Sequence, residues 1–211
     1  MSNPKEIQVD ANYHYKFNNY LDVGRWNSYY YQIAETLAFE PQSVLIIGVG
    51  DNIVGNLLSR QGIKVSTFDF DEKLVPDFLG NITEIDKVLQ GMQFDVLLCC
   101  QVLEHLPFAL FEDILEKLKV VSKNIIISLP YASINYKLEL KLPIIKTVKL
   151  NLNIQRFFKE HQFNGEHYWE IGYKGYSKIK ITRVIANHFT IRKRFVASHN
   201  HYHLFYVLNN N

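Results

Sequence analysis

Two glycines and one carboxylate have the types and spacing of an adenosine-binding site. Gly48 and Gly50 follow an apolar run and precede a helix-like stretch. Glycine permits a sharp turn there and lets a ligand approach the backbone without a Cβ in the way. Asp69 stands 21 residues after Gly48, at the end of the next apolar run, where a carboxylate can accept hydrogen bonds from both ribose hydroxyls. The glycine turn and Asp69 together predict an adenosine ligand.

Two other interpretations of these residues stay open. A dinucleotide site requires a third glycine three residues after Gly50, but Ile53 stands there. Asp51 would also repel a pyrophosphate, whereas a cationic sulfonium would tolerate it. Without any ligand, the glycines would form a tight turn and Asp69 would cap a helix.

A carboxylate and two histidines are candidates for proton transfer. Glu104 and His105 are adjacent, and His167 lies in the later segment Gly165-Glu-His-Tyr-Trp-Glu170. An imidazole that titrates near neutrality can take the proton that a hydroxyl or amine nucleophile loses during group transfer. We therefore expect a catalytic set of Glu104, His105 and His167. The alternative is that Glu104 and His105 cap the following helix and orient the loop.

Five segments resemble the class I S-adenosylmethionine-dependent methyltransferases over about residues 40 to 130. They are Val44-Leu-Ile-Ile-Gly-Val-Gly50, Thr67-Phe-Asp69, Gly80-Asn-Ile82, Phe94-Asp-Val-Leu-Leu-Cys-Cys-Gln-Val-Leu-Glu-His-Leu106 and Ile125-Ile-Ile-Ser-Leu-Pro130. The resemblance implies S-adenosylmethionine as the cofactor. It assigns the methionine end to Gly48 and Gly50, the ribose to Asp69, the adenine to Phe70, Asn81 and Ile82, and the floor beneath the donor to Gln101.

The chain departs from the family pattern at two positions. Ile46 stands where the family commonly has an acidic residue, and Asn52 replaces the third glycine of the loop. These departures bear on donor affinity more than on the fold. Arg25 and Tyr29 in the preceding aromatic stretch are predicted to pack a helix, with the alternative that one of them covers the donor.

A metal site is a further alternative. Some O-methyltransferases of this class, among them quinone-pathway enzymes and small-RNA 3′-end methylases, use Glu-x-x-Glu-His and a later histidine to bind a divalent ion. Here Gln101 replaces the first glutamate, which leaves Glu104, His105 and His167. A neutral amide is a weak ligand for a hard cation, so a firm metal site is not predicted.

Alternating strand-like and helical patterns predict an α/β fold. Apolar runs at 43–50, 63–69, 77–79, 94–100 and 124–129 alternate with helical patterns at 25–39, 52–60 and after Pro107. A helical pattern over 179–185 and β-rich runs at 190–197 and 201–208 follow. We expect a doubly wound, mostly parallel seven-stranded sheet with a C-terminal antiparallel hairpin strand.

The same patterns predict a single methyltransferase domain spanning 1–211. Residues 1–40 form an N-terminal helical cover, 41–130 the donor-binding half, 131–175 an insertion on the substrate side, and 176–211 a closing helix and strands. Lysines, aromatics and isolated prolines over 131–172 show no clean period, so an irregular insertion is expected there.

Charge is unevenly distributed along the chain. Residues 1–130 carry 10 Lys and Arg against 17 Asp and Glu, and residues 131–211 carry 13 against 4, or −7 and +9. These charges are either solvated faces or a basic rim that attracts an anionic substrate. The chain lacks an apolar signal segment and any stretch of eighteen apolar residues, so we expect a cytoplasmic protein without a membrane span. The adjacent Cys99 and Cys100 are expected to be free thiols.

The expected function is methyl transfer to an oxygen or nitrogen nucleophile of a small acceptor, anionic or glycan-like. An RNA methyltransferase is the second interpretation, because the C-terminal part is basic. A catalytically silent Rossmann-like binding subunit is the third, because of Ile46 and Asn52, and a nicotinamide reductase is more remote. The acceptor and the oligomeric state are not predicted.

Overall fold

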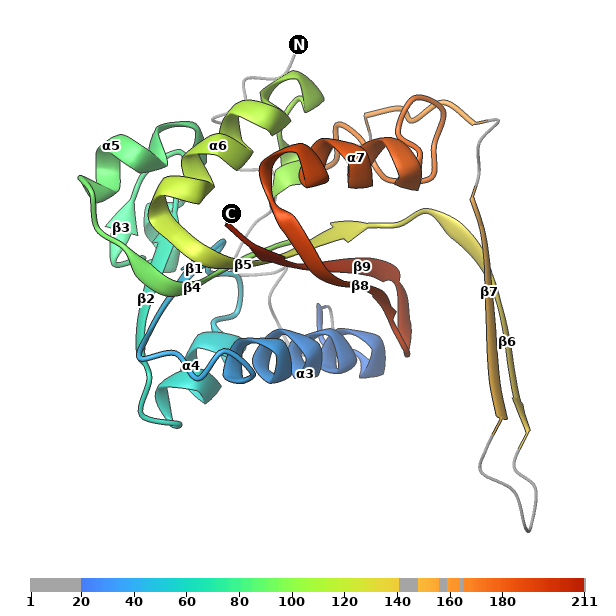
Figure 1. Ribbon diagram of the computed structural model, residues 1–211, viewed down its shortest axis with the longest axis horizontal. Coiled ribbons are helices and arrows are strands. Elements are labelled where there is room, and N and C mark those ends of the chain that lie inside the picture. Colours follow the sequence, from blue (N-terminus) through green and yellow to red (C-terminus); the bar gives the residue numbers. More distant parts are fainter. Residues whose placement is uncertain (1–19, 141–147, 156–158, 164, 211) are drawn as a thin grey trace.

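A seven-stranded sheet with the strand order β3-β2-β1-β4-β5-β9-β8 forms the centre of the molecule (Figure 1). The computed structural model describes residues 20–140, 148–155, 159–163 and 165–210. The strands of this sheet are β1 (Ser43–Ile47), β2 (Lys64–Asp69), β3 (Phe78–Leu79), β4 (Phe94–Cys100), β5 (Ser122–Pro130), β8 (Thr190–Ala197) and β9 (Asn200–Asn209).

The central strands are parallel and the last two are antiparallel. β1 pairs in parallel with both β2 and β4, and β4 with β5, whereas β9 runs antiparallel to β5 and β8. Val44 and Leu45 in β1 are both fully buried, as are Val96 and Leu97 in β4. Strands that are covered on both faces must be apolar throughout, which explains the unbroken runs in the sequence. The predicted mostly parallel sheet with a closing antiparallel hairpin is confirmed.

Helices cover both faces of the sheet. In Figure 1, α5 (Ile85–Leu89), α6 (Phe111–Val121) and α7 (Lys178–His188) lie on one face, and α3 (Val23–Leu37) and α4 (Ile53–Ser59) lie on the other. Short 3-10 turns connect these elements: η1 (Glu72–Leu74), η2 (Ile82–Glu84), η3 (Leu103–His105) and η4 (Phe108–Leu110). Phe111, Ile114, Leu115 and Leu118 of α6 are buried, as their helical spacing predicts.

The segment after β5 corrects one prediction. We expected residues 131–172 to be irregular, but β6 (Ser133–Leu140) and β7 (Val148–Gln155) form an antiparallel two-stranded ribbon that extends away from the main sheet (Figure 1). The register pairs Tyr136 with Leu152 and Leu138 with Leu150. Polar and apolar residues alternate strictly in both strands, which is the strand period that the lysines and prolines around them obscured.

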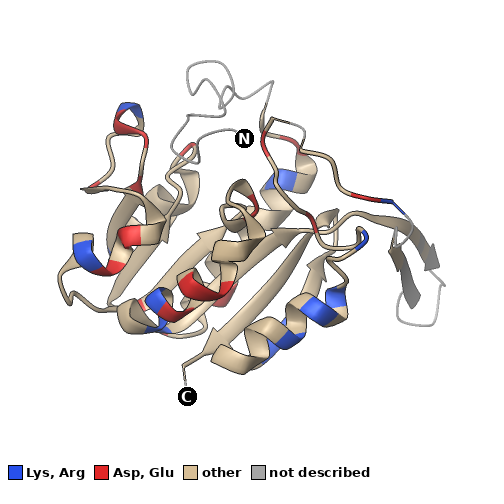
Figure 2. Ribbon diagram, turned by 90° about the horizontal axis from the view of Figure 1, so that it is seen from above, with Lys and Arg blue, Asp and Glu red and all other residues tan. Residues whose placement is uncertain are grey.

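The uneven charge of the sequence appears on two neighbouring helices. Figure 2 shows acidic residues along α6 and basic residues along α7. Glu116 of α6 accepts a hydrogen bond from His188 at the end of α7, which joins the two helices. The basic residues of α7 are Lys178, Lys180 and Arg183.

The two cysteines at the end of β4 are free, as predicted. Burial raises the pKa of the Cys99 thiol well above its ordinary value and that of Cys100 to about 12. Both are therefore thiols near neutral pH, and Cys99 is part of the core. Across the described part of the chain, no helix has the length and apolar character needed to cross a membrane.

Candidate functional site

The turn after β1 requires glycine for two reasons. Gly48 has a φ of +82°, and a Cβ added to it would lie 2.7 Å from Cγ2 of Val102, in the loop after β4. Gly50 also has a positive φ of +55°. Asn52, in the place of the family's third glycine, has a φ of +54°, a conformation that asparagine tolerates better than most residues. The loop thus keeps its left-handed residues despite the substitution.

Asp69 joins this turn to the end of β2. Its Oδ2 accepts a hydrogen bond of 2.8 Å from the N–H of Val49, and its Oδ1 accepts one of 3.0 Å from the N–H of Asp71. The residue is 8% exposed, and burial raises the pKa of its carboxyl group against the lowering effect of backbone N–H donors. Asp69 therefore lies beside the glycine turn, as its spacing predicts.

The three positions assigned to the adenine differ in what they offer. Phe70 is 45% exposed, so its ring is available for stacking. Asn81 Oδ1 already accepts hydrogen bonds from the N–H and the hydroxyl of Thr83, at 2.9 and 2.8 Å. An adenine amino group would compete with Thr83 for that oxygen. The side chain of Ile82 is buried in the core.

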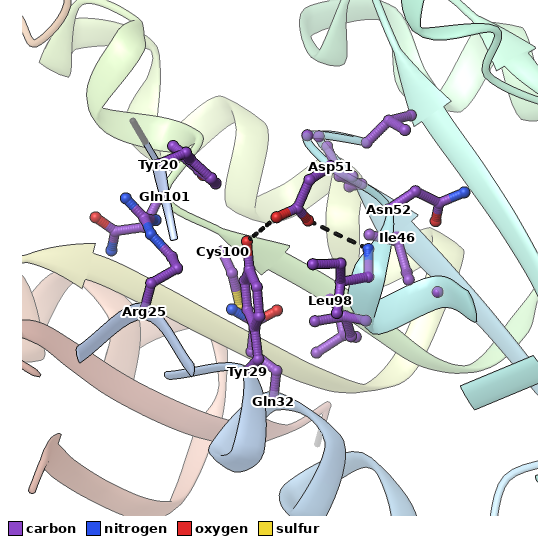
Figure 3. A pocket seen from close by; sticks show the side chains of 17 residues that line it. Tyr20, Arg25, Tyr29, Gln32, Ile46, Asp51, Asn52, Leu98, Cys100 and Gln101 are labelled. Carbon is purple, nitrogen blue, oxygen red and sulfur yellow. Dashed lines mark hydrogen bonds between the residues drawn. The ribbon is translucent and has the colours of Figure 1, made fainter. Parts of the chain in front are cut away.

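A pocket opens between α3, the glycine turn and the end of β4 (Figure 3). It contains Gly48, Gly50 and Gln101 from the predicted site, whereas Asp69, Phe70, Asn81 and Ile82 are not among its lining residues. The other lining residues are Tyr20, Arg25, Tyr29, Gln32, Ile46, Ile47, Val49, Asp51, Asn52, Ile53, Val54, Gly55, Leu98 and Cys100.

One face of α3 forms a wall of this pocket. Arg25, Tyr29 and Gln32 follow a spacing of four and three residues, which places them on the same side of a helix. The guanidinium of Arg25 stacks on the Tyr20 ring at 4.1 Å. Arg25 and Tyr29 therefore face the pocket. Gln32 was not predicted from the sequence, although the same helical spacing places it on this side of α3.

Tyr29 and Asp51 form a hydrogen bond inside the pocket. The Tyr29 hydroxyl donates to Asp51 Oδ2 at 2.6 Å, as the dashed line in Figure 3 shows. Asp51 Oδ1 accepts a second bond, of 3.2 Å, from the N–H of Ile53 at the start of α4. Burial, followed by the neighbouring Tyr20 and Asp51, raises the pKa of Tyr29. Both carboxyl oxygens of Asp51 are therefore hydrogen-bonded at the wall of the pocket.

Gln101 directly follows β4 and lines the pocket. Its φ of +58° is left-handed, and its N–H donates to the carbonyl oxygen of Ser128 at 2.9 Å. The side-chain nitrogen of Gln101 donates to the Ser128 hydroxyl at 3.2 Å. The side chain is thus anchored to β5 while it lines the pocket.

Beyond Gln101, the fold brings the three predicted catalytic residues together. One potential ligand atom each from Glu104, His105 and His167 lies within 4.8 Å of the others. The two imidazole rings are 4.9 Å apart and nearly perpendicular, at 77°. These three residues are called the Glu-His-His cluster below.

Glu104 carries the most unusual electrostatics in this cluster. It is fully buried, and neither carboxyl oxygen has a hydrogen-bond partner among the described residues. Burial raises the pKa of Glu104 to about 7, although His167 opposes that effect. A buried carboxylate without a donor is costly, so Glu104 requires a proton, a cation or a substrate group nearby.

Three hydrogen bonds tie the segment that contains His167 to the loop after β4. The N–H of Tyr168 donates to the Glu104 carbonyl at 2.8 Å, and Trp169 Nε1 donates to the Leu106 carbonyl at 3.1 Å. His105 Nδ1 lies 3.0 Å from the carbonyl oxygen of Glu166. A carbonyl only accepts, so Nδ1 of His105 carries a proton.

The alternative role of Glu104 and His105 as helix caps is wrong. The next long helix, α6, begins at Phe111 and has no side-chain hydrogen bond at its N-cap, Leu110. The intervening turn η4 also lacks one. Glu104 instead lies in the buried cluster, with a carboxyl oxygen within 4.8 Å of a ring nitrogen of each histidine.

No protein-family model matches the chain, and no curated protein matches its sequence significantly. Solved structures do match its fold. N-methyltransferase NodS from Bradyrhizobium japonicum WM9, in complex with S-adenosyl-L-homocysteine, aligns with a TM-score of 0.61 and 8% identity over 90% of this chain and 88% of that chain.

Two further structures have 14% identity to this chain. Magnesium protoporphyrin IX methyltransferase from Synechocystis PCC 6803 aligns with a TM-score of 0.60 over 90% of this chain and 84% of that chain. 1,6-Didemethyltoxoflavin-N1-methyltransferase from Burkholderia thailandensis aligns with a TM-score of 0.58 over 87% and 77%. Both contain bound S-adenosylhomocysteine. Together with the sheet order and the glycine turn, these matches show that the chain has the fold of the class I S-adenosylmethionine-dependent methyltransferases.

Proposed function

We propose that this protein transfers a methyl group from S-adenosylmethionine to an oxygen or nitrogen atom of a small acceptor. The observation that carries the proposal is the position of the Glu-His-His cluster just beyond Gln101, which lines the pocket at the glycine turn. The proposed donor site and the proposed proton-accepting site would thus both lie at the carboxyl ends of the parallel strands. Bound S-adenosylhomocysteine in the structural neighbours supports the choice of donor.

The residues of the pocket suit a donor with a cationic centre and an amino acid tail. Arg25 offers a guanidinium to the carboxylate of the methionine part. Asp51 would place a negative charge near the sulfonium and near the amino group of the methionine part. Asp69 and the exposed ring of Phe70, on the neighbouring β2 side, would hold the ribose and the adenine. Asn81 and Ile82 would border the adenine as well.

Methyl transfer needs an in-line nucleophile and a place for its proton. A lone pair of the acceptor attacks the methyl carbon, the carbon–sulfur bond breaks, and its electron pair stays on sulfur to give S-adenosylhomocysteine. The acceptor proton passes to Nε2 of His105 or His167, which we assign as catalytic residues together with Glu104. The buried Glu104 stabilises the imidazolium that forms. Positioning of the two substrates supplies much of the remaining rate.

A basic surface near the closing helix supports an anionic acceptor. Lys180 Nζ lies 5.0 Å from the centre of the Phe108 ring and 5.7 Å from that of Tyr176, and Lys178 Nζ lies 5.5 Å from that of Tyr131. Phe108 also packs against Trp169, which adjoins the cluster segment. These charges would raise the local concentration of an anion. We also propose the division of residues 1–211 into one domain, with 131–175 on the substrate side.

A divalent metal ion is a second candidate at the cluster. Two imidazoles and a buried carboxylate whose oxygens have no described partner form a donor set that several transition metals accept. Glu104, His105 and His167 would hold the ion, and Gln101 would not be needed. Such an ion would act as a Lewis acid on an acceptor oxygen and lower its pKa.

Calorimetric titration of the full chain tests the proposed donor. We expect S-adenosylhomocysteine to bind at micromolar concentration and NAD to give no heat. Binding of NAD with no response to either S-adenosylmethionine or its product would overturn the proposal. If RNA bound with a steep dependence on salt, the RNA methyltransferase would replace the small-acceptor enzyme as the better interpretation.

A further inference from the structure

A buried glutamate outside the predicted catalytic set contacts one of its histidines. Oε1 of Glu170 lies 2.9 Å from Nδ1 of His167 and accepts a hydrogen bond of 2.6 Å from the hydroxyl of Tyr202, on β9. Nε2 of a third histidine, His161, lies 3.7 Å from the same oxygen. Residues from three parts of the chain therefore converge on one carboxylate.

Glu170 is held as a carboxylate by these donors. The residue is only 6% exposed, and a buried carboxylate is stable only where hydrogen-bond donors replace water. The Tyr202 hydroxyl at 2.6 Å and Nδ1 of His167 at 2.9 Å occupy the positions around Oε1 of Glu170 that water would otherwise take. An ionised carboxylate only accepts hydrogen bonds, so Nδ1 of His167 must be the donor.

We propose that Glu170 is a positioning residue that fixes His167 in its Nδ1–H tautomer and so leaves the lone pair on Nε2 for the cluster. A neutral imidazole has one protonated and one unprotonated nitrogen, and the hydrogen bond at one nitrogen determines the state of the other. The inference rests on the proposed function, because only that function requires Nε2 of His167 to be unprotonated. Both a proton acceptor and a metal ligand need that state.

The second imidazole of the cluster has the same arrangement. His105 is fixed in its Nδ1–H form by the Glu166 carbonyl, 3.0 Å away. In both rings, Nδ1 therefore lies against an acceptor from outside the cluster, a backbone carbonyl for His105 and a carboxylate for His167. The titratable groups that act on or near His167 are Glu104, Glu166, Glu170, His105, His161, Tyr202 and His203.

Nitrogen chemical shifts of the histidine rings test this inference. Long-range ¹H–¹⁵N spectra of the full chain, recorded at alkaline pH with the His167 signals assigned through His167→Asn, distinguish the two tautomers. We expect the Nδ1–H form in the wild type and a shift toward the Nε2–H form in Glu170→Leu. Glu170→Gln, which keeps an acceptor oxygen, is expected to retain most of the Nδ1–H form. Glu160→Leu is the matched control, because Glu160 pairs with Lys174 at the exposed surface.

Turnover gives a second measurement. We expect Glu170→Leu to lower kcat by roughly 10- to 100-fold, with the donor Kd unchanged and much of the rate restored by Gln. An Nε2–H form of His167 in the wild type, or an unchanged tautomer in Glu170→Leu, would overturn the inference. If Glu170→Leu fails to fold, the wild-type spectrum still tests the inference, because it shows which nitrogen of His167 carries the proton. The spectra need neither donor nor acceptor, so their result is separate from the calorimetric test of donor binding.

Discussion

The N–H of Tyr168 donates a hydrogen bond of 2.8 Å to the carbonyl oxygen of Glu104. The bond joins the segment that follows the β6–β7 ribbon to the loop that follows β4. His167 and His105 are the chain neighbours of these two residues, so the bond brings their rings to 4.9 Å. The acceptor side of the proposed site therefore depends on how two distant segments dock.

Replacement of Asp69 should reduce donor affinity. Loss of its carboxylate removes the proposed partner of the ribose hydroxyls, and a hydrogen bond to a charged group contributes about 1.5–3 kcal/mol, or roughly 10- to 100-fold in Kd. Calorimetry on Asp69→Ala measures this. Asp95→Ala is the matched control, since Asp95 accepts hydrogen bonds from Ser43 at the opposite end of the sheet. Equal loss of affinity in both variants would contradict a specific role for Asp69.

Replacement of Arg25 should weaken donor binding through the methionine carboxylate. Arg25→Gln removes a cation that lines the pocket. We expect Kd to increase about 10-fold, which corresponds to the contribution of one charge-assisted hydrogen bond. Arg192→Gln is the control, because Arg192 stacks on Phe39 and does not line the pocket. An unchanged Kd in Arg25→Gln would remove this residue from the donor site.

Gly48→Ala should destabilise the fold more than Gly62→Ala. Both glycines have a φ of +82°, but an added Cβ would meet Val102 Cγ2 at 2.7 Å at Gly48 and nothing within 4 Å at Gly62. We expect Gly62→Ala to cost about 1 kcal/mol from backbone strain, and Gly48→Ala about 2–4 kcal/mol from strain and overpacking. Urea unfolding measures both. Val102→Ala in the Gly48→Ala background should recover part of the loss, and no recovery would argue against the clash.

Glu104 should make stability depend on pH. Its pKa rises on folding from 4.5 to about 7, so the folded state favours the protonated form. The stabilisation is complete below the unfolded pKa and is lost as the pH rises through about 7, a change on the order of 3 kcal/mol. Glu104→Gln should lose this dependence and gain stability relative to the wild type at pH 8. The prediction would be contradicted if the free energies of unfolding of the two proteins changed in parallel from pH 5 to 8.

Thermal denaturation can decide between the two candidate roles of the cluster. A divalent ion bound only by the folded state stabilises that state by about 2.7 kcal/mol at a concentration 100 times its Kd, and Tm rises as a result. If the ion binds here, Mn²⁺ or Zn²⁺ added after chelation should raise Tm in the wild type and in His188→Asn, but not in His167→Asn. His188 pairs with α6 and lies outside the cluster. If the metal ions do not change the Tm of the wild type, and methyl transfer continues in the presence of chelator, the metal role is excluded. The histidines then remain as proton acceptors.

The order of helices and strands could be predicted from the sequence because each element reports its own environment. Val96 to Cys99 are apolar because both faces of β4 are covered there, and the stripe from Phe111 to Leu118 has helical spacing because one face of α6 is buried. The β6–β7 ribbon was missed although its alternation is as regular. Its apolar positions Ile134, Tyr136 and Leu138 are about half exposed, so the ribbon does not need the unbroken apolar run by which the core strands were predicted.

The sequence by itself determined the glycine turn, the carboxylate at Asp69 and the resemblance around Glu104-His105, because these features are local in the chain. Only the tertiary structure decided that His167 meets Glu104 and that Glu170 holds His167, since those contacts depend on the docking of distant segments. It also showed that Arg25 and Tyr29 face the pocket. Local spacing reports which side of an element is buried, whereas packing determines which buried sides meet.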